Sequence, residues 1–297
     1  MELKHDNWRG NTGGTPWMQR SMLWLLRVFD LRIIYAFMAL IVPFYLISRK
    51  KERVAMYHYI RQRMGKNRLT AMWLTYVNQV RFGQIIVDRF AVYAGKRFKL
   101  NIVGYEHFQQ LASQTEGFVQ LSSHVGNYEL AGYHLVAEKP INALIFSGET
   151  ETVMQNRARM FKQNNIRLVP VASDMSHVFT LNNALASGEI VSMPGDRIFG
   201  SQKFVTCQFL GDEAKFPLGP FALAVQRNVP LLSVFSMKTG TRSYEVTCQP
   251  ISLSDEEQDL PARQRTAMLA QQFADQLAEI VRRYPLQWFN YYEFWNQ

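Results

Sequence analysis

The sequence predicts an α/β protein of three layers with a mostly parallel central sheet, preceded by an N-terminal membrane-associated helix. Short apolar runs of strand length alternate along the chain with longer segments of helical periodicity, which is typical of α/β domains. An uncharged apolar run, residues 33–48, comes before all of them. No internal repeat, low-complexity tract or linker interrupts the 297 residues. We therefore expect an N-terminal membrane anchor region, residues 1–50, followed by one domain, residues 51–297.

The segment 33–48 is short for a membrane span. At about 1.5 Å per residue its helix would reach roughly 24 Å, against a hydrocarbon core of about 30 Å. Pro43 would also kink it. The segment therefore either spans with strain and snorkelling arginines, lies partly inserted as a monotopic anchor, or is a buried helix of the domain. We favour membrane contact, without a choice between spanning and partial insertion.

Most of the net charge of +9 lies in one stretch, residues 49–68, which has eight basic residues and one acidic residue, Glu52. A basic stretch can bind nucleic acid. This one directly follows the apolar segment, which favours anionic lipid headgroups over nucleic acid as its partner. By the positive-inside rule we expect the large domain on the cytoplasmic side of the membrane.

The remaining elements follow in order from their periodicity. We expect strands at 98–103, 118–122, 141–146, 168–171 and 190–193, and a late hairpin formed by 231–236 and 244–248. We expect helices at 105–113, 129–137, 150–164, 177–185, 221–227 and 261–283.

One segment, residues 122–129, combines an imidazole and a carboxylate at the end of a predicted strand. A His in that position points into the crevice where α/β proteins usually place their chemistry. Glu129, in the first turn of the next helix, can fold back, accept the second N–H of His124 and stabilise the imidazolium. The pair is the base and the orienting carboxylate of a triad, and the nucleophile would be a hydroxyl or amine of the substrate. The alternative is a structural histidine at a strand end.

The motif His-Val-Gly-Asn-Tyr-Glu, residues 124–129, resembles the H-x4-D/E signature of the glycerolipid acyltransferase superfamily. The Gly-Asn-aromatic-Glu form is similar to the branch that contains the late acyltransferases of lipid A biosynthesis. The resemblance continues in the Asp-containing loop 193–200, in the blocks 209–211 and 216–220, and in the closing Pro-x-Gln-Trp of 284–289. It covers roughly residues 15–297.

This resemblance implies a fold and an activity. The fold would be that of the glycerolipid acyltransferases, with residues 51–297 as the acyltransferase catalytic domain. The activity would be transfer of a fatty acyl group from an acyl thioester, acyl-ACP or acyl-CoA, to a hydroxyl or amine of a lipid acceptor. The implied place is the bacterial inner (cytoplasmic) membrane, with the catalytic domain on the cytoplasmic side.

The same reasoning predicts the site residues. His124 would be the general base and Glu129 would orient it through Nδ1. The predicted substrate-binding residues are Gly126, Asn127, Asp196, Arg197, Gly219 and Pro220. Backbone N–H groups around Gly126 and Asn127, or the guanidinium of Arg197, would stabilise the oxyanion. Two purely structural alternatives stay open: an ion pair between Asp196 and Arg197, and a helix-start role for Gly219 and Pro220.

An acidic carrier protein would need a basic surface. The candidates are Arg157, Arg159, Lys162 and Arg167, or Lys96, Arg97 and Lys99. An ordinary solvated helix face explains the same residues.

Other classes of protein fit less well. We expect no metal and no cofactor, because a thioester is already activated and because the six His and two Cys form no ligand pattern. The motifs GxSxG, Walker A and GxGxxG do not occur, which disfavours a serine hydrolase, a P-loop enzyme and a Rossmann dehydrogenase. Two alternatives remain: an acyl thioesterase on the same fold, and a non-catalytic scaffold that binds lipid or carrier protein.

Overall fold

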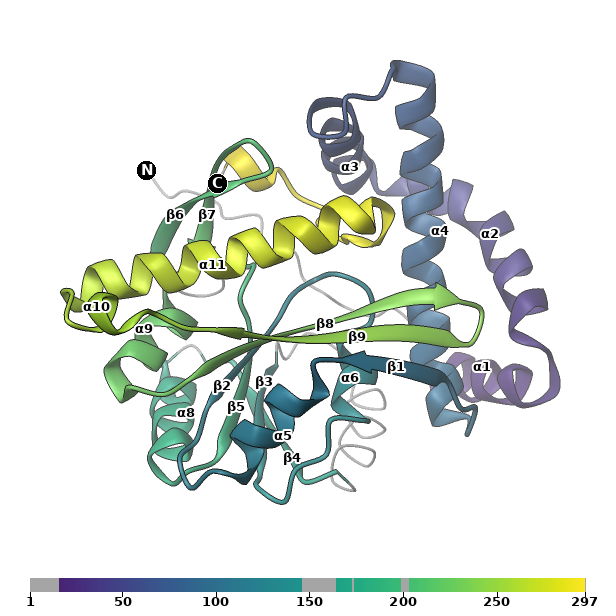
Figure 1. The fold of residues 1–297 in the computed structure, drawn as a ribbon. Coiled ribbons are helices and arrows are strands. Elements are labelled where there is room, and N and C mark those ends of the chain that lie inside the picture. Colours follow the sequence, from purple (N-terminus) through teal and green to yellow (C-terminus); the bar gives the residue numbers. More distant parts are fainter. Residues whose placement is uncertain (1–15, 146–163, 173, 199–202, 297) are drawn as a thin grey trace.

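The computed structural model describes residues 16–145, 164–172, 174–198 and 203–296. A seven-stranded sheet of order β1-β9-β8-β2-β5-β3-β4 lies at the centre of the large domain (Figure 1). All neighbouring pairs are parallel except β8 and β9, which form an antiparallel hairpin. The predicted α/β class with a mostly parallel sheet is confirmed.

The strands lie close to their predicted positions. Their bounds are β1 Lys99–Val103, β2 Val119–Ser122, β3 Ile141–Ile145, β4 Ile166–Pro170, β5 Ile190–Pro194, β8 Leu231–Gly240 and β9 Ser243–Ile251. A separate two-stranded hairpin, β6 Phe204–Phe209 and β7 Asp212–Pro217, was not predicted. Its turn contains Leu210 and Gly211, both at positive φ.

The helices of the domain are α5 Tyr105–Ser113, α6 Tyr128–Gly132, α8 Ser176–Ala186, α9 Gly219–Arg227, α10 Asp255–Gln258 and α11 Ala262–Arg283, followed by the 3-10 helices η1 Pro285–Gln287 and η2 Phe294–Asn296. The helix expected at 129–137 is shorter than predicted, because it ends at Gly132, a poor helix former. The helix expected at 150–164 lies almost entirely outside the described residues.

Side chains of the sheet alternate between two cores. In β8, Leu231, Phe235 and Met237 belong to the core that α9 and α11 also line, whereas Leu232 and Val234 belong to the core of α5 and α6. The alternation follows from the period of two along a strand. The sheet is therefore the middle of three layers, as predicted.

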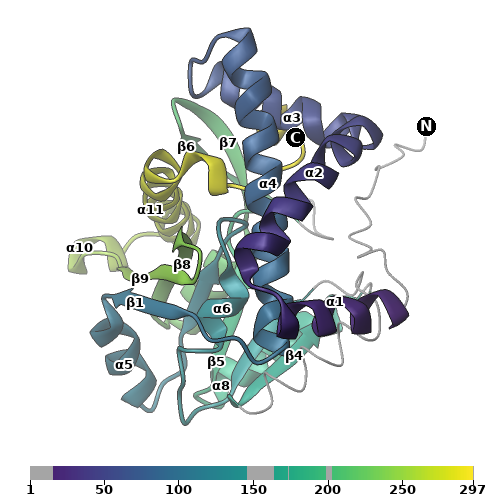
Figure 2. The same ribbon diagram turned by 90° about the vertical axis from the view of Figure 1, so that its right-hand side faces the viewer.

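The N-terminal part is a group of helices on one side of the sheet domain: α1 Pro16–Val28, α2 Leu31–Ser48, α3 Lys50–Gln62 and α4 Arg68–Tyr93 (Figures 1 and 2). The 26-residue α4 was not predicted. Among the described residues only α2 is long and apolar enough to cross a membrane by length and composition, with a mean hydropathy of 2.0. Only 17% of that window is buried, because α4 covers just one side of α2 and leaves the rest exposed.

Candidate active site

The register of two central strands brings His124 and Asp196 together. Strands β2 and β5 are parallel neighbours in which Ser122 is paired with Pro194, and each site residue follows two positions later. Carboxyl ends of parallel strands meet at the same edge of a sheet, and this edge is where α/β proteins bind ligands. The backbone pairing continues one step further, where Gly195 N–H donates to the Ser122 carbonyl at 2.8 Å.

Asp196 binds His124 with both carboxylate oxygens. Oδ1 lies 2.8 Å from the imidazole Nδ1, and Oδ2 accepts the backbone N–H of His124 at 2.8 Å. The Asp196 side chain is only 2% exposed, whereas that of His124 is 23% exposed. The buried carboxylate therefore fixes both the backbone and the ring of a histidine that solvent still reaches.

Opposing effects set the pKa values of this pair. Burial would raise the pKa of Asp196, but His124, Arg197 and the His124 N–H outweigh it, and the pKa is lowered. The pKa of His124 is lowered by burial and by the charges of Arg197 and Arg89, against the opposing effect of Asp196. Near pH 7 the pair is therefore a carboxylate beside a neutral imidazole.

The prediction that Glu129 holds His124 through Nδ1 is wrong about which carboxylate does so. Glu129 lies in α6 with its side chain 1% exposed, and its Oε1 pairs with the Arg89 guanidinium at 3.3 Å. Its Oε2 accepts the hydroxyls of Tyr93 at 3.2 Å and Tyr133 at 3.3 Å. Its position in the first turn of α6 places this carboxylate between α6 and α4. Asp196 is the carboxylate that contacts His124 Nδ1.

Arg89 is a site residue that the sequence did not reveal. It comes from α4, outside the sheet, and its guanidinium also lies over the Tyr128 ring at 5.2 Å from the centroid. The Tyr128 ring in turn packs edge-on against the His124 ring, with centroids 6.4 Å apart. No local motif surrounds Arg89, so only the packing of α4 on α6 could identify it.

Gly126 and Asn127 have structural roles. Gly126 adopts φ +51°, and a Cβ there would lie 1.9 Å from the Ser236 carbonyl oxygen. Its N–H donates to the Gln287 carbonyl at 2.9 Å, and the Asn127 N–H donates to the Ser236 carbonyl at 2.7 Å. Both N–H groups therefore have backbone partners here, which favours Arg197 over them as the predicted oxyanion donor. The Asn127 side chain caps α6 by accepting the Leu130 N–H at 3.4 Å.

The C-terminal segment holds the His124 loop in place. Val125 forms an antiparallel bridge with Trp288, and the Phe289 N–H donates to the His124 carbonyl at 2.8 Å. Arg197 donates to the Phe289 carbonyl at 2.9 Å and lies over the Tyr292 ring at 5.5 Å from the centroid. Asp196 therefore binds His124 while Arg197 binds the C-terminal segment, which disfavours the alternative of a structural pair between the two.

The remaining residues predicted to bind substrate or carrier protein either lie in other elements or fall outside the described residues. Gly219 and Pro220 begin α9, with Pro220 buried in its first turn, so their helix-start role is present and a substrate contact stays a prediction. Among the candidates for carrier binding, Arg167 pairs with Glu189 at 3.0 Å. Arg157, Arg159 and Lys162 lie outside the described residues. No cluster of three or more potential metal ligands occurs among the residues that the structure describes.

A family model described as bacterial lipid A biosynthesis acyltransferase matches residues 79–296. The chain belongs to this family. It is therefore an acyltransferase of lipid biosynthesis, and an acyl donor and a lipid acceptor are its substrates. The match includes the His124 loop, Asp196, Arg197 and the C-terminal segment, and its start lies within α4, ahead of Arg89.

Among solved structures, the 1-acyl-sn-glycerophosphate (LPA) acyltransferase PlsC from Thermotoga maritima is similar to this acyltransferase, with 14% identity and a TM-score of 0.37. The alignment covers 88% of this chain and 98% of that one. No functionally curated protein matches the chain.

Proposed function

We propose that this acyltransferase moves a fatty acyl group from an acyl thioester to a hydroxyl or amine of a lipid acceptor, with His124 as general base and Asp196 as the residue that positions it. The 2.8 Å contact between His124 Nδ1 and Asp196 Oδ1 carries the proposal. An ionised Asp196 can only accept, so Nδ1 holds the proton and Nε2 has the lone pair that a general base needs. A neutral imidazole near pH 7 is the active form.

The reaction follows from these roles. Nε2 removes the acceptor's proton as the acceptor oxygen or nitrogen bonds to the thioester carbonyl carbon. Asp196 stabilises the imidazolium so formed, as the carboxylate of a catalytic triad does. When the tetrahedral intermediate collapses, the C–S bond breaks and the imidazolium returns the proton to the leaving thiolate. No other nucleophile is required.

Arg197 is the charged donor that we assign to the oxyanion. Its charge depresses the pKa of His124, which supports a position close to the reacting atoms. The contact with the Phe289 carbonyl uses one of the five N–H groups of the guanidinium, and a planar fork can serve two acceptors. Glu129 supports the site indirectly, by holding Arg89 against α6.

We further propose that the enzyme acts on the cytoplasmic side of a bacterial inner membrane, in lipid A or a related lipid pathway. The apolar α2 and the basic residues that follow it support this location, as does the typical membrane association of the family. Most of the protein should therefore stay with membranes in high salt, because salt screens charges but does not release a buried apolar helix. Release by salt alone would contradict membrane insertion.

The test uses the purified protein in detergent with acyl-ACP or acyl-CoA and a panel of acceptors: lipid A precursors, lysophospholipids and aminolipids. Mass spectrometry should detect an acylated lipid, and the better donor identifies the thioester class. His124→Ala should lower the rate by about 10²- to 10⁴-fold without loss of folding. Release of free fatty acid without lipid product would instead indicate a thioesterase. Full activity of His124→Ala would refute the mechanism.

A further inference from the structure

The first end of α2 is bonded to the sheet domain. Asp30, which caps α2, pairs with Arg242 in the β8–β9 turn at 3.0 Å. One turn into the helix, the buried Tyr35 hydroxyl donates to Asp88 of α4. Lys238 of β8 completes this buried cluster, since it pairs with the same Asp88 and donates to the Tyr35 hydroxyl at 3.0 Å.

The other end of α2 returns to the same body. Beyond Ser48 the chain turns at Arg49 into α3, and Arg53 of α3 donates to the Leu46 carbonyl at 2.9 Å. Tyr59 of α3 is buried in the main core, where its ring meets Trp288 edge-on at 4.9 Å between centroids. Its hydroxyl also donates to the Pro285 carbonyl at 3.2 Å.

Between its ends α2 lies along α4. Tyr76 of α4 donates to the Ala39 carbonyl at 3.2 Å, near the middle of α2. Gly83 of α4 faces Met38 so closely that a Cβ would lie 2.3 Å from the Met38 sulfur. Both ends and the middle of α2 are therefore held on one folded unit (Figures 1 and 2).

The opposite face of α2 is apolar and exposed. Its outward residues recur at helical spacing and are between 58% and 73% exposed: Ile33, Phe37, Leu40, Phe44 and Ile47. The first turns of α4 add three more exposed apolar side chains: Leu69, Met72 and Trp73. Together these exposed apolar side chains have the composition of a surface that meets lipid.

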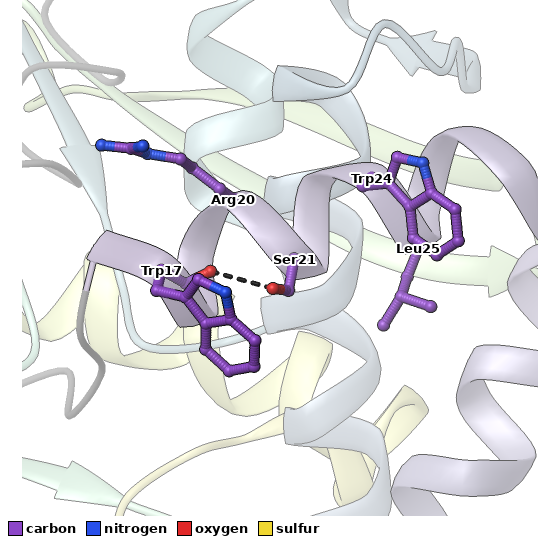
Figure 3. Close-up of a pocket in the computed structure, with 5 residues that line it drawn as sticks. All are labelled: Trp17, Arg20, Ser21, Trp24 and Leu25. Atoms are coloured by element: carbon purple, nitrogen blue, oxygen red, sulfur yellow. Dashed lines mark hydrogen bonds between the residues drawn. The ribbon is translucent and has the colours of Figure 1, made fainter.

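Helix α1 also exposes large apolar side chains, in a different pattern. Trp17, Trp24 and Val28 are exposed on the side opposite the buried Leu26. Arg20 and Arg27 form a parallel row beside the tryptophans. Trp17, Arg20, Ser21, Trp24 and Leu25 line a shallow pocket on α1, and Figure 3 shows the two indole rings on either side of Ser21. Indole rings beside arginines suit the boundary between anionic headgroups and acyl chains.

We infer that α2 does not cross the membrane but lies in the plane of one leaflet, and that α1, the outer face of α2 and the first turns of α4 form a single monotopic docking face. A crossing helix would place its two ends on opposite sides of a hydrocarbon core about 30 Å thick. Here the end near Asp30 contacts the sheet domain directly, and the end near Arg49 is joined to it through α3, whose Tyr59 packs against Trp288. The inference rests on the membrane association proposed above and specifies its geometry.

Depth measurement on vesicles tests the inference. Single substitutions Ile33→Cys, Leu40→Cys and Ile47→Cys, each labelled with an environment-sensitive fluorophore, sample one face of α2 over 14 residues, or about 21 Å of helix. The native Cys207 and Cys248 are buried, so they compete little for the label. The matched control is Phe179→Cys, an exposed aromatic position on α8. Lipids with quenchers at known depths, in vesicles of phosphatidylcholine and phosphatidylglycerol, report the depth of each label.

Similar shallow depths at residues 33, 40 and 47, with no quenching at 179, would support the docking face. A deepest label at residue 40 with 33 and 47 in opposite leaflets would overturn the inference, yet leave membrane association standing. Absence of vesicle binding would refute both. Acyl transfer, measured with the same samples, reports separately on the proposed reaction.

The arginine row gives a second measurement. Arg20→Gln and Arg27→Gln should each weaken binding to vesicles rich in phosphatidylglycerol by about fivefold, and barely change binding to neutral vesicles. Arg263→Gln, an exposed arginine at the start of α11, is the matched control and should have no effect. Equal losses on both kinds of vesicle would exclude headgroup contact by α1.

Discussion

Asp196 and Glu129 are both buried carboxylates near the same loop, yet they have different partners. Asp196 follows β5, and the register of β2 and β5 brings it to the ring of His124. Glu129 is five residues from His124 in sequence, but α6 directs its carboxylate to Arg89, Tyr93 and Tyr133. The comparison teaches that closeness in sequence is a poor guide to which carboxylate orients a histidine, whereas strand register is a good one.

The largest loss of activity is expected from Asp196→Asn. The amide keeps the size but removes the charge that holds the Nδ1 proton and stabilises the imidazolium, so kcat should fall by about 10²- to 10⁴-fold. Kinetics at saturating donor with varied acceptor measures the loss. A near-normal kcat would show that Asp196 does not position the base.

Glu129→Gln should reduce activity much less and stability more. Loss of the charge leaves Arg89 without its carboxylate, which should lower the free energy of unfolding by about 2 kcal/mol. Thermal unfolding beside kinetics separates the two effects, with Glu138→Gln, an exposed acid in the following loop, as the control. A loss of kcat as large as that of Asp196→Asn, with an unchanged midpoint, would return the orienting role to Glu129.

The pH dependence of kcat/KM tests the surroundings of His124. Protonation inactivates the base, and its pKa is lowered from 6.5, so the acid limb of kcat/KM should lie below pH 6.5. The charged groups around the ring are Asp196 and Arg197 from the loop after β5 and Arg89 from α4. Arg89→Gln removes a positive charge and should shift the limb to higher pH, whereas Arg89→Lys should shift it less. An unchanged limb in Arg89→Gln would mean that Arg89 acts only through packing.

The smallest effect is expected from Arg197→Lys. Lysine keeps the charge but lacks the planar fork, so the loss in kcat/KM should be below the roughly 10²-fold that removal of an oxyanion donor brings. Stability should fall by about 1 kcal/mol through the weakened contact with the Phe289 carbonyl. A lowered thermal midpoint with normal acceptor dependence would remove Arg197 from the active site.

Local patterns were sufficient for most elements. Helix α5 has the predicted bounds, and α11 and the β8–β9 hairpin lie where their periodicity places them. Helix α4 was not predicted because its sequence has no clear apolar stripe. The stripe is absent because α1, α2, α3 and the C-terminal segment contact this helix on several sides. The β6–β7 hairpin was not predicted because its strands are short and half-exposed.

The sequence by itself determined the class of fold and the family and singled out His124 as the proposed base, because strand periodicity and the His124 motif are local properties. It also located Asp196 and Arg197 in one loop. Only the tertiary structure decided that Asp196 rather than Glu129 binds Nδ1, since 72 residues separate the two and the register of β2 and β5 joins them. The same holds for Arg89, for the Asp30 end of α2 and for Tyr59 of α3, whose partners come from distant elements and depend on packing rather than on any local pattern.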